Sequence, residues 1–323
     1  MAAKIWNTQQ KVVEEVFFQN EAVSLCLLIN RRVRTMRIID FRAGPTSAKR
    51  LFVLSLAQRE GVEKAYTLVE RDEVQTWIKL GFAKEGTIPG FYKRSDAFLL
   101  GCSIRAPGRQ VPAGISEKGD DADDAPFESE TRIAAVKPSG TAPISPSQEL
   151  MERTVATAKR EVKDPTDPIP QARIAPVSEA DARRAAVAAQ RSGRALTAFE
   201  PFGRDVARRF FMATARGGFE LHASTEAQGC FGNAFLELLV APRTPAERVG
   251  TAAAVKALGE KLQAEGVVTS FALTPSDDVA LAAAFLHGGF RRTGLLLGHL
   301  LVGSQRKDAI VWSRKLANPV EDA

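Results

Sequence analysis

A stretch that cannot build a hydrophobic core divides this chain of 323 residues into two parts. Between residues 105 and 168, Pro, Gly, Ser and the acidic run GDDADD dominate, followed by the sequence KPSGTAPISPS. Such a composition buries too little apolar surface to offset the conformational entropy that is lost on folding. The sequence therefore predicts a flexible linker over residues 105–170, interrupted by one helix over residues 148–162, with a folded unit on each side.

The first unit, residues 1–104, alternates strand and helix signals. Apolar runs bounded by turn residues predict strands, and apolar residues that recur every three or four positions predict helices. In chain order we expect a helix over 6–20, strands over 22–30 and 34–41, a helix over 47–60, a strand over 65–69, a helix over 72–80 and a strand over 96–104.

The second unit, residues 171–317, is longer and alternates in the same way. We expect a strand over 173–176, helices over 179–191 and 203–215, strands over 219–224 and 231–240, a helix over 246–265, a strand over 269–273, a helix over 277–286, and strands over 294–302 and 309–314. Ser178 is the expected N-cap of the first of these helices. The alternation predicts an α/β fold with a mixed sheet in each unit.

An ordered series of matches relates the two units to each other. Each carries the pattern Leu-x-x-x-Asp-x-Val, then a helix, a Gly-Phe pair and a glycine four residues after the Phe. The paired glycines at the end of this series are Gly86 and Gly294, and each unit then closes with Asp-Ala and an apolar strand. The order of the matches predicts an internal duplication.

Composition and cysteine spacing restrict the class of protein. The chain is 45% hydrophobic and 25% charged, which is typical of a soluble globular protein. Its three cysteines, Cys26, Cys102 and Cys230, form no CxxC pair and have no histidine beside them. This spacing argues against a metal site or a disulfide framework and fits a reducing compartment. Glutamates near the start interrupt the apolar core that a signal peptide needs, so we expect a cytoplasmic protein without a membrane segment.

The net charge of +6 points to a polyanionic ligand, either nucleic acid or a nucleotide cofactor. Proteins that bind single strands carry basic grooves with interleaved aromatic side chains on which bases stack. We find no basic helix of that kind in the sequence, and this argues against nucleic acid as the partner.

The sequence LELLVAPRTPAERVGTA, residues 236–252, holds the clearest binding signal. A strand here runs into the longest expected helix, and the free N–H groups and positive dipole end of a helix N-terminus hold a pyrophosphate well. Glycine lets the backbone approach such a ligand closely. The candidate cradle consists of Arg248, Gly250, Thr251 and Ala252, with Arg243 adding charge at its rim.

This stretch, with the element order around it, resembles the GNAT acyltransferases, and the first unit is similar to a partial member of that family. The resemblance implies acetyl-CoA or another acyl-CoA as cofactor, with Leu239 and Val240 pairing through their backbones with the pantetheine arm. It also implies an amine acceptor, either a small molecule or a protein lysine or N-terminus. A further protein partner is expected to bind through the first unit or the linker.

The resemblance also suggests which residues carry the chemistry. A base must deprotonate the amine, and Glu237 stands where many family members place a carboxylate. Strand alternation would turn Glu237 to the face opposite its two leucine neighbours. The family's acid, a tyrosine, is replaced by Phe285 in the second unit, and His287 is the candidate substitute.

One residue departs from the family pattern in the cradle itself. The family has Gln or Arg three residues before the loop glycine, whereas this chain has Glu247, whose charge opposes a pyrophosphate. Two functions therefore stay open. One is an acyl-CoA-dependent N-acyltransferase that transfers directly to a primary amine. The other is a catalytically degenerate relative that serves as an acyl-CoA sensor or a protein-interaction module.

Overall fold

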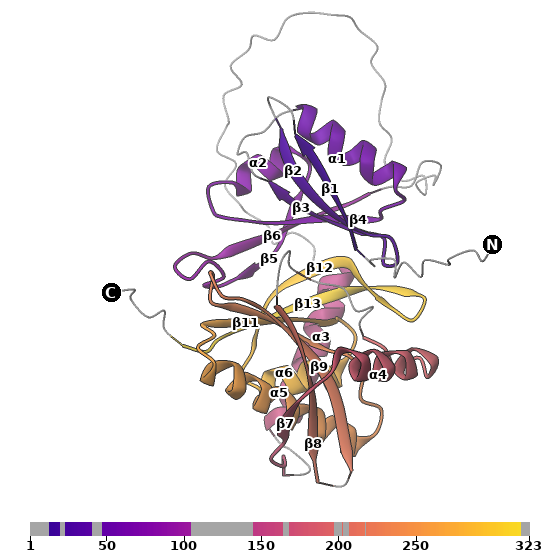
Figure 1. Ribbon diagram of the computed structural model, residues 1–323, viewed down its shortest axis with the longest axis vertical. Coiled ribbons are helices and arrows are strands. Elements are labelled where there is room, and N and C mark those ends of the chain that lie inside the picture. The colour runs from indigo at the N-terminus through magenta and orange to yellow at the C-terminus, as the bar shows by residue number, and fades with distance from the viewer. Residues whose placement is uncertain are drawn as a thin grey trace, which may run out of the picture.

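The computed structural model describes residues 13–19, 23–40, 47–104, 145–163, 168–196, 202, 207–216 and 218–317. Within these ranges the strands form one 13-stranded sheet in the order β1-β2-β3-β4-β6-β5-β12-β13-β11-β10-β9-β8-β7. Residues 13–104, the N-terminal half, supply the first six strands, and residues 145–317, the C-terminal half, supply the other seven (Figure 1). Both parallel and antiparallel pairs occur, so the predicted α/β fold with a mixed sheet is confirmed.

The N-terminal half packs two helices against six strands. Its elements are β1 (Val13–Gln19), β2 (Ser24–Asn30), β3 (Thr35–Asp40), α1 (Ser47–Arg59), β4 (Lys64–Val69), α2 (Val74–Lys79), β5 (Ala83–Ile88) and β6 (Ala97–Ser103). The apolar run SLCLLIN becomes β2, which is almost wholly buried because it lies between two other strands. The core of this half includes Trp77, whose ring meets that of Phe82 edge to face at 4.9 Å.

The C-terminal half contains the other four helices of the described residues. Its elements are α3 (Pro146–Lys163), β7 (Arg173–Val177), α4 (Glu179–Arg191), β8 (Ala207–Ala215), β9 (Phe219–Gln228), β10 (Asn233–Leu238), α5 (Pro245–Ala264), β11 (Thr269–Pro275), α6 (Val279–His287), β12 (Arg291–Val302) and β13 (Gln305–Lys315). The predicted cap of α4 is confirmed, since the Ser178 side chain accepts from the backbone N–H of Asp181.

The two faces of this half of the sheet carry different helices. On β8, Phe211 packs in the large core together with residues of α3, α5 and α6, whereas the adjacent Phe210 packs with Ala182 of α4. Successive side chains of a strand point to opposite faces. On β10 the same alternation puts Leu236 and Leu238 in the large core and leaves Phe235 and Glu237 on the opposite face.

The two halves meet where β5 and β12 pair antiparallel at Gly86 and Gly294. These are the two glycines that end the repeated series in the sequence. A Cβ at Gly86 would lie 3.3 Å from the Gly294 Cα, and one at Gly294 would lie 2.6 Å from the backbone oxygen of Glu85. Only glycine allows the two strands to approach so closely. A third core cluster, with Tyr66 and Phe271 among its members, includes residues of both halves.

Two predicted helices are wrong. Residues 13–19, expected to lie in a helix over 6–20, form the edge strand β1, and residues 207–215, expected in a helix over 203–215, form β8. Both segments were predicted as helices because their apolar residues lie close together, but pairing with neighbouring strands determines their conformation. Strand β1 pairs with β2 along its full length, and β8 pairs on both sides, with β7 and β9. Residues 6–12 and 203–206 lie outside the described residues.

The helix predicted inside the linker is present as α3, and it is part of a core. Met151, Val155 and Ala158 on one face of α3 are buried in the large core of the C-terminal half, against α6. Residues 105–144 and 164–167 of the expected linker lie outside the described residues, and the domain boundaries stay a prediction.

Candidate functional site

The central parallel pair of the C-terminal half opens after three residues. Strands β10 and β11 pair only from Asn233 to Phe235 on one side and from Thr269 to Phe271 on the other. Beyond this point β10 continues toward Val240 and β11 toward Pro275, and the two strands no longer pair with each other. The divergence makes room for a ligand between two strands that are otherwise neighbours.

A cavity of about 80 Å³ lies at this opening and extends to the N-terminal half. Its lining comes from both halves: Val33, Thr35, Tyr66, Leu196, Phe202, Phe235, Glu237, Leu238, Leu273, Thr274, Pro275, His299, Leu300 and Leu301. Most of these side chains are apolar or aromatic, and Glu237 is the one carboxylate among them. A mostly apolar cavity with a few polar groups is the usual form of a small-molecule site.

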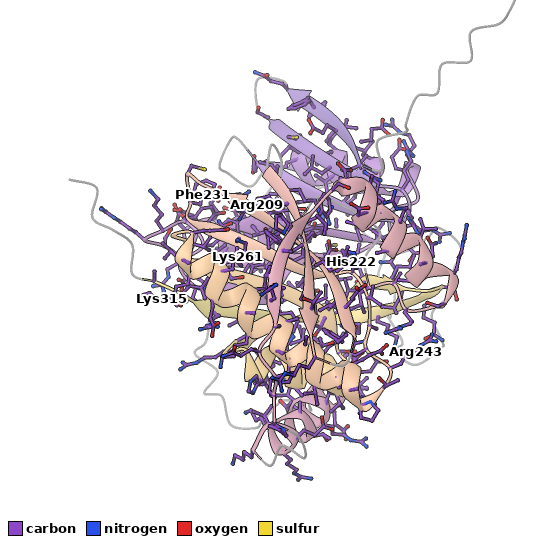
Figure 2. The ribbon with its side chains drawn as sticks, turned by 60° about the horizontal axis from the view of Figure 1, so that its bottom comes forward. Arg209, His222, Phe231, Arg243, Lys261 and Lys315 are labelled. Carbon is purple, nitrogen blue, oxygen red and sulfur yellow. The ribbon has the colours of Figure 1, made fainter. Side chains whose placement is uncertain are left out.

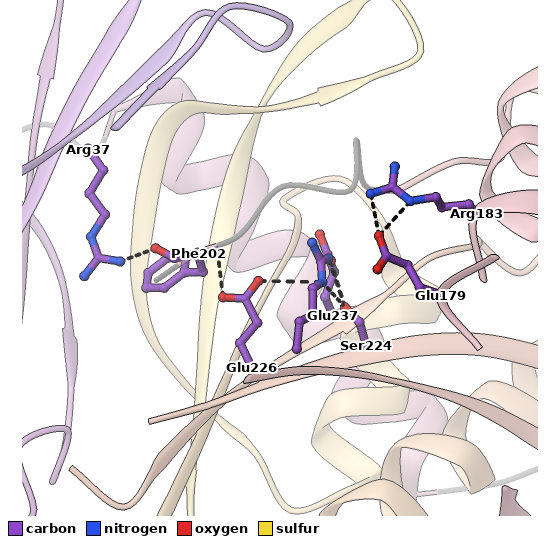
Figure 3. A network of polar contacts seen from close by, with 8 residues as sticks. Arg37, Glu179, Arg183, Phe202, Ser224, Glu226 and Glu237 are labelled. Carbon is purple, nitrogen blue, oxygen red and sulfur yellow. Dashed lines mark hydrogen bonds and ion pairs between the residues drawn. The ribbon is translucent and has the colours of Figure 1, made fainter. Parts of the chain in front are cut away.

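Glu237 stands at the centre of a polar network on β10. Its carboxylate accepts hydrogen bonds from the Arg208 guanidinium and from the Ser224 hydroxyl, the latter at 3.1 Å (Figure 3). The Glu237 side chain is 16% exposed and lines the cavity, as alternation along the strand predicted. Arg208 and Ser224 therefore fix the direction in which the carboxylate faces.

The same network continues to the N-terminal half. Arg208 lies 3.7 Å from a carboxylate oxygen of Glu226, and the other oxygen accepts from the backbone N–H of Phe202 at 2.8 Å. The backbone oxygen of Phe202 in turn accepts from Arg37 on β3, and the Arg37 guanidinium lies 5.0 Å from the Phe202 ring (Figure 3). One continuous set of contacts thus joins Glu237 to a strand of the other half.

His299 is a second polar residue of the cavity, and a β-bulge places it there. The register of β12 against β13 shifts between Leu296 and Leu300, and Gly298 adopts a φ of 54°. The Asp308 carboxylate accepts from the Gly298 N–H at 2.7 Å, and Arg306 donates to the Gly298 oxygen at 2.8 Å. Bulges of this kind re-aim a side chain, and here the re-aimed side chain is a histidine.

The imidazole of His299 is buried and neutral. Its ring meets the Tyr66 ring edge to face at 4.7 Å, and its Nδ1 has no hydrogen-bond partner among the described residues. Burial, with smaller contributions from the charges of Lys64 and Arg306, lowers the pKa of His299 to about 3. The cavity is therefore lined by an uncharged imidazole, whose buried Nδ1 has no hydrogen-bond partner within the described part of the chain.

The backbone of Leu239 and Val240 is engaged within the chain. The Leu239 N–H donates to the backbone oxygen of His222 on β9 at 3.0 Å, and the backbone oxygen of Leu239 accepts from the Leu196 N–H at 3.1 Å. Ala195 forms an isolated bridge with Val240. The segment after α4 thus lies against the end of β10, where the resemblance placed the pantetheine arm, and the role of this backbone stays a prediction.

Helix α5 begins before the predicted cradle, at Pro245, and it is capped from within. The Thr244 side chain accepts from the Glu247 N–H at 3.2 Å, and the Glu247 carboxylate accepts from the backbone N–H groups of Arg243, at 2.6 Å, and Thr244. Arg194 donates to the same carboxylate at 2.8 Å. The N–H of Arg243, supported by these other donors, holds the pKa of Glu247 below its ordinary value.

The rest of the predicted cradle lies one to two turns inside α5. Gly250, Thr251 and Ala252 are buried, and the Thr251 hydroxyl donates to the Glu247 backbone oxygen at 2.7 Å. A Cβ at Gly250 would lie 2.6 Å from the Phe219 ring, so this glycine serves the packing of α5 on β9. Arg243 and Arg248 are exposed, and Figure 2 shows Arg243 at the end of α5 opposite to Lys261.

The residues considered for the acid role lie apart from the cavity. His287 is the last residue of α6, and partial burial and the charge of Lys256 lower its pKa. Phe285 packs in the large core, stacked on Trp312 at 6.0 Å and edge to face on Phe290. Neither His287 nor Phe285 lines the cavity.

Sequence reasoning missed Arg208, Arg194 and His299. Arg208 fell inside a predicted helix, so its neighbours on β9 and β10 were not expected. Gly298 within an apolar strand was a signal for a bulge, and with it for a re-aimed His299, that the sequence did contain. Among the described residues no cluster of His, Cys, Asp and Glu is arranged to hold a metal, and no helix there is long and apolar enough to cross a membrane.

No protein-family model matches the chain, and no curated protein matches it either. Among solved structures, the chain is similar to the ribosomal-protein-S18-alanine N-acetyltransferase from Escherichia coli, at 20% identity over 47% of this chain and 99% of that one, with a TM-score of 0.36. It is also similar to the spermidine N-acetyltransferase from Vibrio cholerae, solved with CoA and spermine, at 11% identity over 46% and 97% of the two chains, with a TM-score of 0.37.

A third similar structure is a putative acetyltransferase from Sphaerobacter thermophilus, at 16% identity over 45% of this chain and 94% of that one, with a TM-score of 0.36. The neighbours are acetyltransferases. Identities of 20% or less and TM-scores below 0.4 carry no weight for function, which has to rest on the geometry of the chain's own residues.

Proposed function

We propose that this chain is an acyl-CoA-dependent N-acyltransferase of the GNAT type, which transfers an acyl group directly to a primary amine. The observation that carries the proposal is the position of Glu237, whose carboxylate lines the cavity at the opening between β10 and β11. A carboxylate in a mostly apolar cavity suits both the binding of an ammonium group and the removal of its proton.

The proposed reaction uses few groups of the chain. Glu237 takes a proton from the amine, whose nitrogen attacks the thioester carbonyl, so that a C–N bond forms while the C–S bond breaks. Arg208 and Ser224 hold the Glu237 carboxylate in place for this step. The departing thiolate then takes up a proton from water, and Glu237 returns to the resulting hydroxide the proton that it took from the amine. Water serves here because the residue at the family's acid position is Phe285, buried in the core.

The start of α5 suits the anionic part of the acyl donor, and the contacts of the Glu247 carboxylate support this. Its carboxylate acts as an internal anion, held by two backbone N–H groups and by Arg194. These donors, with Arg243 and Arg248 nearby, suit a pyrophosphate equally well. Glu247 competes for them, however, so its side chain has to turn away before a phosphate can bind there.

The observation that favours the second candidate function, an acyl-CoA sensor or interaction module without catalysis, is Phe285, which stands at the family's acid position and is buried in the core. A sensor needs donor binding but no base, whereas the enzyme needs both. The two proposals therefore differ in what Glu237 does and agree on the start of α5.

Replacing the carboxylate of Glu237 separates them. Glu237→Gln keeps the shape of the side chain, so acetyl-CoA should bind as it does to the wild type in a calorimetric titration. Turnover with primary amines should fall by about 10²–10⁴-fold, the usual contribution of a positioned base, and the loss should shrink at high pH, where the amine is already deprotonated.

Glu220→Gln, on the exposed part of β9, is the matched control and should leave turnover unchanged. Equal turnover of Glu237→Gln and wild type would remove Glu237 from the mechanism. Wild-type protein that binds acetyl-CoA but acetylates no amine in a broad panel would favour the sensor. A lack of acetyl-CoA binding at millimolar concentration would reject both functions.

A further inference from the structure

The cavity is shared by the two halves, and the shared part goes beyond the groups that the reaction needs. Val33, Thr35 and Tyr66 of the N-terminal half form one wall of it, and the Tyr66 ring lies 4.7 Å from the ring of His299. No step of the proposed transfer requires any of these three residues. Their presence in the lining therefore calls for a separate explanation.

The wall is fixed to the rest of the cavity by direct contacts. Arg306, next to the bulge that carries His299, donates to the backbone oxygen of Val33 and forms an ion pair with Glu63 at 2.7 Å. The same Arg306 holds the bulge through the Gly298 oxygen. One side chain thus sets the distance between His299 and the N-terminal half.

The groups in the cavity match a compact ammonium end. Glu237 supplies a carboxylate, which it shares with Arg208, and the rings of Tyr66, Phe202 and Phe235 line the same space, where aromatic groups stabilise a cation. A volume of about 80 Å³ is smaller than the ~150 Å³ cavity that takes up benzene. Only a group of a few non-hydrogen atoms can enter, such as the aminoethyl end of a larger molecule.

We propose that this composite cavity is the acceptor site, that the imidazole ring of His299 accepts a hydrogen bond from the bound amine, and that Val33, Thr35 and Tyr66 limit the acceptor to an unbranched primary amine. This inference rests on the proposed function for its reaction, but the binding it describes can be observed without any acyl donor. The N-terminal half then sets specificity, and it does so without a cofactor of its own.

The three histidines of the chain make a direct test practical. In protein labelled with ¹⁵N-histidine, the resonances of His222, His287 and His299 can be assigned from the His→Gln variants. Ethylamine should shift the His299 ring resonances in a saturable way and leave those of His287 and His222 in place. Isopropylamine and tert-butylamine, which are branched, should have at least tenfold weaker effects.

Variants then test the wall and the histidine by kinetics. His299→Gln and Val33→Leu should raise the KM for ethylamine at least fivefold while leaving acetyl-CoA binding unchanged, and His287→Gln is the matched control that should change neither. Unmoved His299 resonances, or equal shifts of all three histidines, would overturn the inference even if acetyl transfer is observed. A His299 shift without acetyl-CoA binding would reject the proposed function and leave the cavity as an amine-binding site.

Discussion

Helices α1 and α5 start differently, although each of them connects the two strands of a parallel pair, β3 with β4 and β10 with β11. At α1, Lys49 forms an ion pair with Asp40 at 2.5 Å, with side chains 1% and 4% exposed, and Lys49 lies 6.0 Å from the Trp77 ring. At α5, Glu247 pairs with Arg194 at 2.8 Å, with side chains 29% and 24% exposed. The ion pair at the start of α1 is buried, whereas the ion pair at the start of α5 is in contact with water.

This difference in burial has an energetic consequence. Removing one partner of a buried ion pair costs about 3–5 kcal/mol, whereas pairs at the surface contribute only about 0–1 kcal/mol. The pair at the start of α1 is therefore part of the core. The pair at the start of α5 contributes little to stability, so an anion that replaces the Glu247 carboxylate there, as proposed for the acyl donor, disrupts little of the fold.

The strongest test of this contrast is Asp40→Ala. The substitution removes the carboxylate paired with a buried ammonium group, so the free energy of unfolding in urea should fall by about 3–5 kcal/mol. The corresponding change in the other half, Arg194→Gln, should cost less than about 1 kcal/mol. Equal losses in the two variants would show that the α5 pair is as structural as the α1 pair.

An intermediate effect on stability is expected at His299, which lies where the two halves meet and is buried without a carboxylate beside it in the described residues. Its pKa in the folded chain is about 3, below the ordinary value of 6.5, so the unfolded chain takes up a proton between these two values that the folded chain does not. The contribution of His299 to the free energy of unfolding is constant above pH 6.5. It falls by about 1.4 kcal/mol for each pH unit between the two pKa values.

Urea unfolding at pH 7.5 and pH 5 measures this contribution. The loss between the two pH values should be about 2 kcal/mol larger in wild type than in His299→Gln, because the variant lacks the titrating group. His287→Gln should keep nearly all of the wild-type loss, since His287 is only partly buried. The same loss in all three proteins would mean that the His299 ring is reached by water.

The smallest effect concerns the anion site itself. Glu247→Gln removes the charge that opposes a phosphate but keeps a side chain able to cap α5, so the affinity for acetyl-CoA should rise by up to about tenfold. Calorimetry with acetyl-CoA measures the change, and Glu260→Gln, further along α5, serves as control. Weaker binding to the Glu247 variant would contradict the competition between this carboxylate and the ligand.

Local signals predicted much of the fold correctly. Helix α4 was predicted at its observed bounds, because Ser178 and the small apolar residues after it are local signals that act within the helix. Strands β1 and β8 were not, because their conformation is decided by partners distant in the sequence. The local signal was genuine in these segments, and pairing in the sheet overrode it.

The site was predicted in part, for the same kind of reason. The orientation of Glu237 follows from alternation along a single strand, and the sequence sufficed for it. The acid position of the resemblance led to His287, on the last turn of α6, whereas the cavity contains His299. The position of His299 depends on a bulge held by Asp308 and Arg306 and on a wall from the other half. Gly298 signals the bulge locally, but Arg306 contacts Val33 across 273 positions of the sequence, and no local pattern contains that contact.

The pair of glycines where β5 meets β12 limits which substitutions this chain can accept there. Gly86 and Gly294 each face the other, so any side chain at one position meets the backbone of the opposite strand. If the two halves descend from one unit that paired with its own copy through this edge, a single ancestral glycine would have faced itself across a two-fold axis. Duplication would then have split one constraint into two, the stricter one at Gly294, where a Cβ would lie 2.6 Å from the Glu85 oxygen, compared with 3.3 Å for the nearest atom at Gly86.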